Sequence, residues 1–334
     1  MSIKAAVVGT GYLGSFHAEK YAKSENAELL AVVDIIPAKA QTCAERLGTK
    51  AVLDYRELPA LGVQCASIAA DTAAHYEVAA WLLANGVDVL VEKPMASSTK
   101  QAQELIDLAE KHGRILQVGH LERFNPAFRA MENLLTRPRF FEARRISPFA
   151  GRGHDVDVVL DLMIHDIDII AHLVGRPLEK VDAVGVPVLT NSVDIANARL
   201  TFEGGAVANV TASRVSFKSE RSLRIFQPDV YIVLDYGNKK LKMYSKTAPS
   251  ADGTLPQIAI AEHDVEERDA LADEIDSFLR CVETRSRPIV AGEDGMRALA
   301  LADRIRAAFA ESLSVYEKDA PYALAAKAAV AAEL

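Results

Sequence analysis

The chain has 334 residues and a formal net charge of −8 at pH 7; half of its residues are hydrophobic and a quarter are charged. This length predicts two domains rather than one core, and the acidic balance argues against a general nucleic-acid or anionic-membrane binder. The three cysteines are far apart, no segment is apolar over the length of a membrane span, and "MSIK" leads straight into a strand-like segment, so we expect a cytoplasmic protein without a signal peptide.

Short apolar segments alternate with helical patterns over the first part of the chain. Strands are expected at 3–9, 27–34, 65–70, 87–93 and 114–120, and helices at 12–22, 37–48, 73–85 and 98–112. This alternation predicts an α/β domain with a parallel, doubly wound Rossmann sheet over residues 1–121.

The pattern then changes to a run of strand-like segments. Helices are expected at 126–136, 157–173, 264–285 and 294–313, and strands at 139–148, 180–188, 194–203, 205–214, 221–227, 229–236 and 239–245. "EGG" at 203–205 and "GNKK" at 237–240 are typical of hairpin turns. We therefore expect an α+β domain with a large, mostly antiparallel open sheet over residues 122–334, whose last helices can pack back on the first domain.

The stretch "VVGTGYLG" carries a phosphate-binding pattern between a strand and a helix. It places Gly9, Gly11 and Gly14 in the spacing G-x-G-x-x-G. The first glycine permits a tight turn, the second lets the backbone approach a pyrophosphate, and the third lets the helix pack closely on the strand. This context favours a dinucleotide site over an ordinary glycine-rich turn.

Asp34 ends the second strand, twenty residues after Gly14. A carboxylate at this point can bind the ribose 2′-hydroxyl of the cofactor and would repel a 2′-phosphate. Ile35 and the two residues after it provide no arginine for a phosphate, and Lys39 is the only nearby cation. We expect NAD rather than NADP as the cofactor.

A second chemical signal lies in "DVVLDLMIHDIDII", a largely aliphatic segment from Asp157 to Ile170. Asp161, His165 and Asp168 interrupt it at i, i+4 and i+7, which places them on one face of a helix. Because burial of a charge is unfavourable unless the charge is paired or used, this stripe predicts a contribution to a substrate site.

Residues 122–152 contain seven arginines, three glutamates and no lysine, a local balance of +4: Arg123, Arg129, Arg137, Arg139, Arg144, Arg145 and Arg152. A planar guanidinium matches phosphate oxygens, so the cluster suits a nucleotide-sugar diphosphate. The alternative is a set of solvated or ion-paired surface arginines. Arg123 and Arg152 are the expected diphosphate contacts, and Phe124 and Asn125 are expected to shape the same pocket.

Taken together, these motifs resemble the Gfo/Idh/MocA oxidoreductases. The resemblance rests on "GTGYLG", Asp34, the histidine of "DTAAHYEVA", "VEKP" at 91–94 and the Asp161-x-x-x-His165-x-x-Asp168 pattern, and it covers nearly the whole chain. It implies a Rossmann domain, a C-terminal domain whose open sheet mediates dimer or tetramer formation, and an active site between the domains. It assigns the cofactor to these residues: Gly9, Thr10, Gly11, Tyr12, Leu13, Gly14, Asp34, Ile35, Ala70, Asp71, His75, Glu92 and Lys93.

Two features refine this resemblance. The family usually has Thr-Pro where this chain has Ala70-Asp71, so the loop beside the nicotinamide is expected to follow its own path. The stretches "GHLERFNPAF" and "GRGHDVDVVLDLMIHDIDI" resemble a subgroup that oxidises the C3 hydroxyl of UDP-N-acetylglucosamine, before an aminotransferase acts in lipid A biosynthesis.

Oxidation of a secondary alcohol by NAD needs a base for the hydroxyl proton and a group that stabilises the alkoxide. Lys93, at a strand end and followed by Pro94, suits the second task, and His165 suits the first because an imidazole titrates near neutral pH. Asp161 would orient the imidazole or bind a sugar hydroxyl, and Asp168 would support it.

Other interpretations remain open. Lys93 can be a surface lysine, His165 can be a core histidine bonded to a carboxylate, and His154, Asp157, Asp161 and His165 can form a metal site; hydride transfer with a lysine needs no metal, and none is expected. The substrate can also be a free polyol or aldose of the inositol type. A non-catalytic NAD-binding sensor is the alternative of another class.

Overall fold

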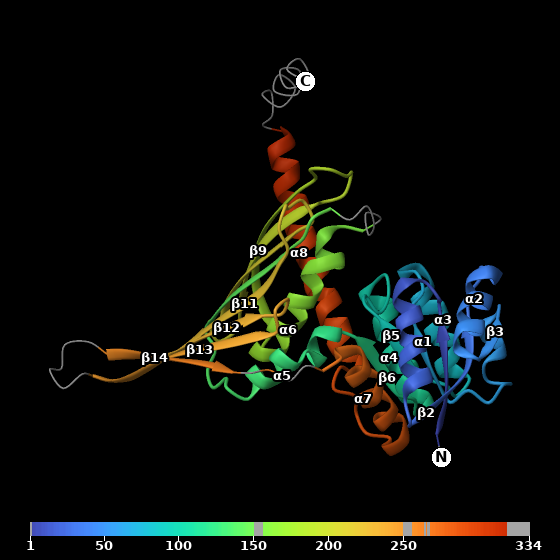
Figure 1. Cartoon of the computed structure of the whole chain (residues 1–334). Helices are drawn as coiled ribbons and strands as arrows, with labels where there is room; N and C mark the ends of the chain where they lie inside the picture. Colours follow the sequence, from blue (N-terminus) through green and yellow to red (C-terminus); the bar gives the residue numbers. More distant parts are fainter. Residues whose placement is uncertain (1, 150–155, 250–255, 264, 266–267, 319–334) are drawn as a thin grey trace. The chain divides into compact units, whose positions relative to one another are not determined.

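The structure is a computed structural model that describes residues 2–149, 156–249, 256–263, 265 and 268–318 (Figure 1). The chain separates into two compact units, which are described in turn. Unit 1 comprises Met1–Leu134, Lys239–Leu241 and Asp264–Ala300, and unit 2 comprises the remaining residues. The structure thus groups α5 (Pro126–Glu132) and α7 (Ala270–Thr284) with unit 1.

Unit 1 is built on a parallel sheet, which confirms the predicted Rossmann fold. Its strand order is β3-β2-β1-β4-β5-β6, with the strands β1 Ile3–Val8, β2 Ala27–Val33, β3 Lys50–Val52, β4 Cys65–Ile68, β5 Asp88–Glu92 and β6 Leu116–Gly119. The connecting helices are α1 Tyr12–Lys23, α2 Pro37–Leu47, α3 Thr72–Ala84 and α4 Thr99–His112, with short 3-10 turns η1 Tyr55–Glu57 and η2 Leu121–Phe124. The strand order reverses between β1 and β4, where ligands of such sheets bind.

The strands at the centre of this sheet are covered on both faces. Every residue of β4, β5 and β6 is buried, as expected for a parallel sheet between two layers of helices. Helix α7 contributes Leu271, Ile275, Phe278 and Leu279 to the same core that holds Tyr21 of α1. Its N-cap is Asp269, whose carboxylate accepts hydrogen bonds from the amides of two residues in the first turn.

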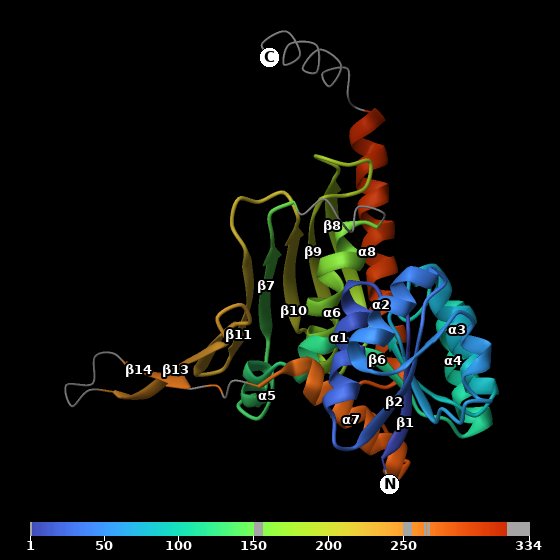
Figure 2. The ribbon, with the colours of Figure 1, turned by 45° about the vertical axis from the view of Figure 1, so that its right-hand side comes forward.

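Unit 2 contains the second predicted sheet (Figure 2). Within the described residues its order is β14-β13-β12-β11-β7-β10-β9-β8. The strands are β7 Phe140–Ile146, β8 Leu178–Val186, β9 Ile195–Phe202, β10 Val207–Ser213, β11 Glu220–Gln227, β12 Val230–Asp235, β13 Lys240–Pro249 and β14 Pro256–His263. The pairing is mostly antiparallel, as predicted, but β7 and β10 run parallel. The predicted turn at "EGG" joins β9 to β10, with positive φ angles of 86° and 82° at its two glycines.

The predicted single helix over 157–173 is wrong in one respect. Val159–Met163 form a π-helical turn, η3, and the α-helix α6 begins at Ile164 and ends at Val174. A π turn closes its hydrogen bonds from i to i+5 rather than from i to i+4, so Asp161 lies in a wider turn than His165, which lies in α6. The last described helix of the chain, α8, spans Gly292–Lys318.

The two faces of the unit 2 sheet differ. On one face lie α6 and, from Leu301 on, α8 (Figure 2). Arg145 of β7 points to this face, because its guanidinium binds the Asp166 carboxylate of α6 at 2.9 and 3.1 Å. Among the described residues, no helix combines the length and the apolar content required to cross a lipid bilayer.

Candidate functional site

The glycine loop after β1 is shaped for a ligand. Gly9 has a φ of +90°, and a Cβ atom at this position would lie 2.6 Å from the carbonyl oxygen of Ala69. A Cβ on Gly14 would lie 1.8 Å from the carbonyl oxygen of Gly9, so strand and helix touch there. A Cβ on Gly11 would meet no described atom within 4 Å. Packing therefore requires the first and third glycines, whereas the second leaves open space where a pyrophosphate would fit.

Asp34 lies directly beside this loop. Its Oδ2 accepts hydrogen bonds from the amide and the hydroxyl of Thr10, at 2.9 and 2.8 Å, and its Oδ1 accepts one from the amide of Ile36 at 2.9 Å. Partial burial raises the pKa of Asp34, but the hydrogen bonds from Ile36 and Thr10 outweigh it and lower the pKa overall. The carboxylate is thus ionised and oriented, which fits the ribose diol of NAD.

A pocket of about 330 Å³ lies next to Thr10. Its lining residues are Thr10, Ser15, Ala38, Lys39, Thr42, Cys43 and Arg46. Arg46 forms an ion pair with Glu19 of α1, and Lys39 lowers the pKa of Asp34 by its charge. Of the other predicted cofactor residues, Tyr12 and Ile35 are 69% and 89% exposed, so both are accessible to a ligand at this edge of the sheet.

His75 connects two loops at the carboxyl edge of the sheet. Its Nε2 lies 2.9 Å from the carbonyl oxygen of Ala70, after β4, and its Nδ1 lies 2.9 Å from that of Pro94, after β5. The ring is buried, whereas Asp71 is exposed. Because the ring contacts backbone on both sides, it holds the loops that carry Ala70 and Lys93 at a fixed separation.

The "VEKP" motif ends β5 with two side chains of different burial. Glu92 is 7% exposed and its Oε1 lies 3.0 Å from Nε2 of His17 on α1, whereas Lys93 is partly exposed. Glu92 Oε2 also accepts the amide hydrogen of Lys93, at 3.2 Å. Lys93 thus starts a loop at the ligand-binding edge of the sheet, and Glu92 anchors its backbone.

In unit 2, the charged stripe is unevenly buried. Asp161 and His165 are partly exposed, and Asp168 is 1% exposed. Asp166, which sequence reasoning did not select, pairs with Arg145 inside the unit. This pair could not be found from local spacing, because its partners lie on a helix and a strand that only the fold brings together.

The arginines of this stretch that the structure describes are divided between the two units. Arg123 is 1% exposed and lies 3.9 Å from Asp294 within unit 1, whereas Arg145 is buried in unit 2. Arg144 lies on the exposed side of β7, 3.9 Å from Glu220. Arg152 lies outside the described residues. The burial of Arg123 leaves it almost no surface for contact with a substrate diphosphate.

The neighbours of Arg123 also have structural contacts. Phe124 is 4% exposed, and Asn125 caps α5 by accepting the amide hydrogen of Ala127 at 3.0 Å.

Of the alternative metal ligands, His154 lies outside the described residues. Asp157 accepts hydrogen bonds from two amides of its own turn and from Nε of Arg306, at 2.6 Å.

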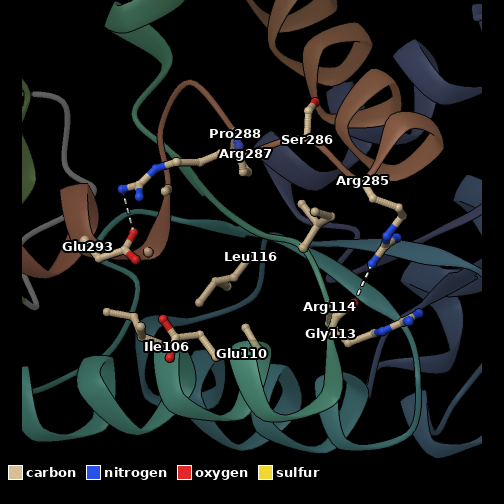
Figure 3. A pocket seen from close by; sticks show the side chains of 14 residues that line it. Ile106, Glu110, Gly113, Arg114, Leu116, Arg285, Ser286, Arg287, Pro288 and Glu293 are labelled. Atoms are coloured by element: carbon tan, nitrogen blue, oxygen red, sulfur yellow. Dashed lines mark hydrogen bonds and ion pairs between the residues drawn. The ribbon is translucent and has the colours of Figure 1, made fainter.

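Another hollow of unit 1, of about 350 Å³, lies between α4 and the segment before α8 (Figure 3). It adjoins the amino end of β6, so it is on the edge of the sheet opposite the glycine loop. Its basic residues are engaged: Arg285 binds Asp88 and the carbonyl of Gly113, and Arg287 binds Glu293 at 3.0 Å. This hollow is therefore a poor candidate for an anionic ligand.

Comparisons with known proteins agree with this geometry. Residues 3–120 match the family described as "Oxidoreductase family, NAD-binding Rossmann fold", and residues 132–232 match the "GFO/IDH/MocA C-terminal domain". A UDP-N-acetylglucosamine 3-dehydrogenase from Acidithiobacillus ferrooxidans is 37% identical over 92% of this chain and 97% of its own length. A scyllo-inositol 2-dehydrogenase (NAD(+)) from Bacillus subtilis is 27% identical over 87% of this chain and 90% of its own.

Solved structures give the same result. That of the Acidithiobacillus ferrooxidans UDP-N-acetylglucosamine 3-dehydrogenase has a TM-score of 0.87 and 36% identity, over 92% of this chain and 97% of that chain. A levoglucosan dehydrogenase solved with NADH has a TM-score of 0.81 over 93% of this chain and 98% of that chain. At 18% identity, the latter likeness shows a shared fold alone.

Proposed function

Since the chain belongs to the Gfo/Idh/MocA oxidoreductase family and is an NAD-dependent dehydrogenase that acts on a CH–OH group, we propose that its substrate is UDP-N-acetylglucosamine. The reaction is oxidation of the sugar C3 hydroxyl to a ketone. The observation that carries the proposal is the 37% identity to a UDP-N-acetylglucosamine 3-dehydrogenase along almost the full length of both chains. The inositol dehydrogenase is more distant, at 27%.

In the proposed reaction, His165, Lys93 and Asp161 have different roles. Bound NAD supplies the acceptor for the C3 hydride. The imidazole of His165 takes the hydroxyl proton, and Nζ of Lys93 stabilises the oxygen as negative charge develops on it. Asp161 orients the imidazole or binds a neighbouring hydroxyl. The C3–H electron pair leaves as hydride and the C3–O bond becomes a carbonyl, so the products are the 3-keto sugar, NADH and one proton.

A 3-keto nucleotide sugar is a suitable substrate for transamination. We therefore place the reaction before an aminotransferase that installs a 3-amino group, in lipid A or lipopolysaccharide biosynthesis. This placement rests on the resemblance of the "GHLERFNPAF" stretch and the charged helix to the subgroup with that role.

The test is a screen of UDP-N-acetylglucosamine, other UDP-sugars and free inositols for NADH formation. We expect turnover with UDP-N-acetylglucosamine and a product that has lost two hydrogen atoms by mass. Reaction with methoxyamine, which traps ketones, would locate the carbonyl by fragmentation. Turnover with free inositols alone would reject the proposed substrate.

A free polyol is the second candidate, because one observation favours it. Within the arginine cluster expected to bind a diphosphate, two members are buried in ion pairs: Arg123 and Arg145. A free polyol needs no such cluster. Competition by UDP distinguishes the candidates, since UDP inhibits only an enzyme that binds the nucleotide part of its substrate.

A further inference from the structure

Unit 1 contains a buried group of three ionisable side chains that the proposed reaction does not use. His17 of α1, Glu92 of β5 and Glu274 of α7 are 0%, 7% and 0% exposed. One ligand-type atom from each lies within 4.8 Å of the others. The elements that carry them pack together, since α7 lies against α1 and α1 lies on the sheet. Burial of three ionisable groups together is unfavourable unless their charges are paired or neutralised, so the arrangement needs an explanation.

Glu92 is the best-connected member. Its Oε1 lies 3.0 Å from Nε2 of His17, and its Oε2 accepts the amide hydrogen of Lys93. A Cβ atom on Gly119 would lie 2.7 Å from the carboxyl carbon of Glu92, so β6 leaves this side chain no room on that side. Glu92 therefore joins α1, which follows the glycine loop, to the backbone at Lys93.

Glu274 is the member that needs an explanation. Within the described residues, both of its carboxylate oxygens are buried without a hydrogen-bond partner, as are Nδ1 of His17 and Oε1 of Gln117. No lysine or arginine among these residues forms an ion pair with Glu92 or Glu274. An ionised Glu274 would thus be a desolvated charge near a second carboxylate, without a cation to offset it.

A proton on Glu274 resolves this conflict. Burial, and then the neighbouring Glu92 carboxylate, raise the pKa of Glu274 well above its ordinary value. A protonated carboxyl group also supplies a donor hydrogen where acceptor atoms are in excess. The other titratable group that faces it is Tyr21 of α1, whose hydroxyl is bonded to Ser67 at 2.9 Å and whose pKa is raised by burial. Tyr21 stays neutral and provides no compensating charge.

We propose that Glu274 is a neutral carboxylic acid that shares its proton with His17 and Glu92, and that this buried triad positions the backbone at Lys93. The second half rests on the proposed function, because it gives Lys93 a task in the reaction. With its proton bound, Glu274 adds no second negative charge beside the Glu92 carboxylate that accepts the amide hydrogen of Lys93. Glu274 is a positioning residue: it acts through Glu92 rather than on the substrate.

A divalent cation is the competing occupant, since two carboxylates and an imidazole can bind one. The 3.0 Å separation of His17 Nε2 and Glu92 Oε1 is that of a hydrogen bond, and a cation held by both atoms would replace the hydrogen between them. A shared proton requires no such change. Metal content therefore forms part of the test.

The first experiment does not depend on activity. Infrared difference spectra of the full chain at neutral pH compare the unmutated protein with Glu274→Gln and with a matched control, Asp276→Asn, an exposed carboxyl on the same helix. We expect a protonated-carboxyl band in the unmutated protein and the control, and its loss in Glu274→Gln. A band unchanged by Glu274→Gln would overturn the proposal. Stoichiometric zinc or manganese that binds the unmutated protein but not Glu274→Gln would overturn it in favour of a metal site.

The second experiment tests the positioning role with NAD and UDP-N-acetylglucosamine. Glu274→Ala should lower kcat by about tenfold or more through a misplaced Lys93, with little change in the KM for NAD. Glu274→Gln keeps a neutral group of the same shape and should restore most of the loss. Lower stability with normal kcat in Glu274→Ala would show a merely structural role. If no sugar is oxidised by the unmutated protein, the proposed function fails, while the infrared result still decides the proton.

Discussion

Asp34 receives two hydrogen bonds from Thr10, one from the amide at 2.9 Å and one from the hydroxyl at 2.8 Å. Thr10 lies inside the glycine loop, so the carboxylate proposed to bind the ribose is fixed to the same segment that would hold the pyrophosphate. One short stretch of backbone therefore sets two parts of the dinucleotide site. This coupling makes NAD binding sensitive to Thr10 as well as to Asp34.

We predict that Asp34→Ala narrows the preference for NAD over NADP by about tenfold or more, because it removes both the diol acceptor and the charge that repels a 2′-phosphate. Thr10→Val is the matched control: it removes the hydroxyl donor at 2.8 Å but leaves the charge. We expect Thr10→Val to weaken NAD binding while discrimination is largely kept. The measurement is kcat/KM for both cofactors, and equal values in the unmutated protein would contradict this account.

If His165 is the base and Lys93 stabilises the alkoxide, replacement of either residue should remove stabilisation of the transition state. Lys93→Ala and His165→Ala should each lower kcat and kcat/KM together by about 10². His172→Ala, on the same helix as His165, is the control and should be close to normal. Asp161→Asn should be intermediate. The measurement is single-turnover NADH formation, made after the NAD affinity of each variant has been checked. Normal hydride transfer in His165→Ala would show that His165 is not the base and would assign that role to Lys93.

The cofactor half of the site was predictable because its signals are local. The spacing of Gly9, Gly11 and Gly14 and the place of Asp34 at a strand end follow from a few residues read in order, and the structure gives each a distinct spatial reason. The alternation of strands and helices was predictable for the same reason, because each element shows its pattern within a short stretch of sequence. Short strands such as β3, with three residues, carry too little pattern to be found.

The buried polar contacts were not predictable. Glu274 and Glu92 are far apart in sequence and meet only because α7 packs against α1 within unit 1. In the sequence, "ADEIDSF" is typical of an ordinary amphipathic helix. Arg145 was predicted as one of seven arginines suited to a diphosphate, and only the fold shows that Asp166 lies opposite it. The π turn at Val159–Met163 also left no mark in the apolar periodicity.

Burial of Arg123 leads to a prediction about stability. Arg123→Ala should lower the free energy of unfolding by about 3 kcal/mol, since it removes a buried cation next to Asp294. Arg129→Ala, at an arginine whose side chain is 50% exposed, is the control and should have little effect. Urea denaturation measures both. An Arg123→Ala protein of normal stability with a raised KM for UDP-N-acetylglucosamine would instead support contact with the diphosphate.

The face of the unit 2 sheet opposite α6 carries an aromatic row. Phe140, Phe226, Tyr231 and Tyr244 follow one another with ring centroids 5.4, 4.6 and 5.2 Å apart. Such a row, on a face that no described helix of unit 2 covers, predicts an interface, and we expect a dimer or tetramer. Tyr231→Glu should shift the mass by light scattering toward the monomer, whereas Gln103→Glu, at an exposed residue of α4 in unit 1, should not. A dilute unmutated monomer would reject the interface.

Asp194 should make the stability of the chain dependent on acid pH. Its side chain is fully buried and accepts hydrogen bonds from the amides of Val188, Leu189 and Thr190 and from Nε of Arg214, at 2.6 to 2.8 Å. Burial raises the pKa of this carboxyl, but the amide and guanidinium donors outweigh it and hold the pKa well below its usual range.

A carboxyl whose pKa is lower in the folded than in the unfolded state stabilises the fold only while it is ionised. The contribution of Asp194 is therefore complete above its unfolded pKa of about 3.9 and is lost as the pH falls below that value toward the folded pKa. Asp194→Asn should lower the free energy of unfolding at pH 7 and flatten its decline between about pH 5 and pH 2. Asp182→Asn, at an exposed residue of β8, is the control and should keep the full decline. Urea titrations at each pH give both slopes, and an unchanged decline in Asp194→Asn would assign the acid sensitivity to other carboxyls.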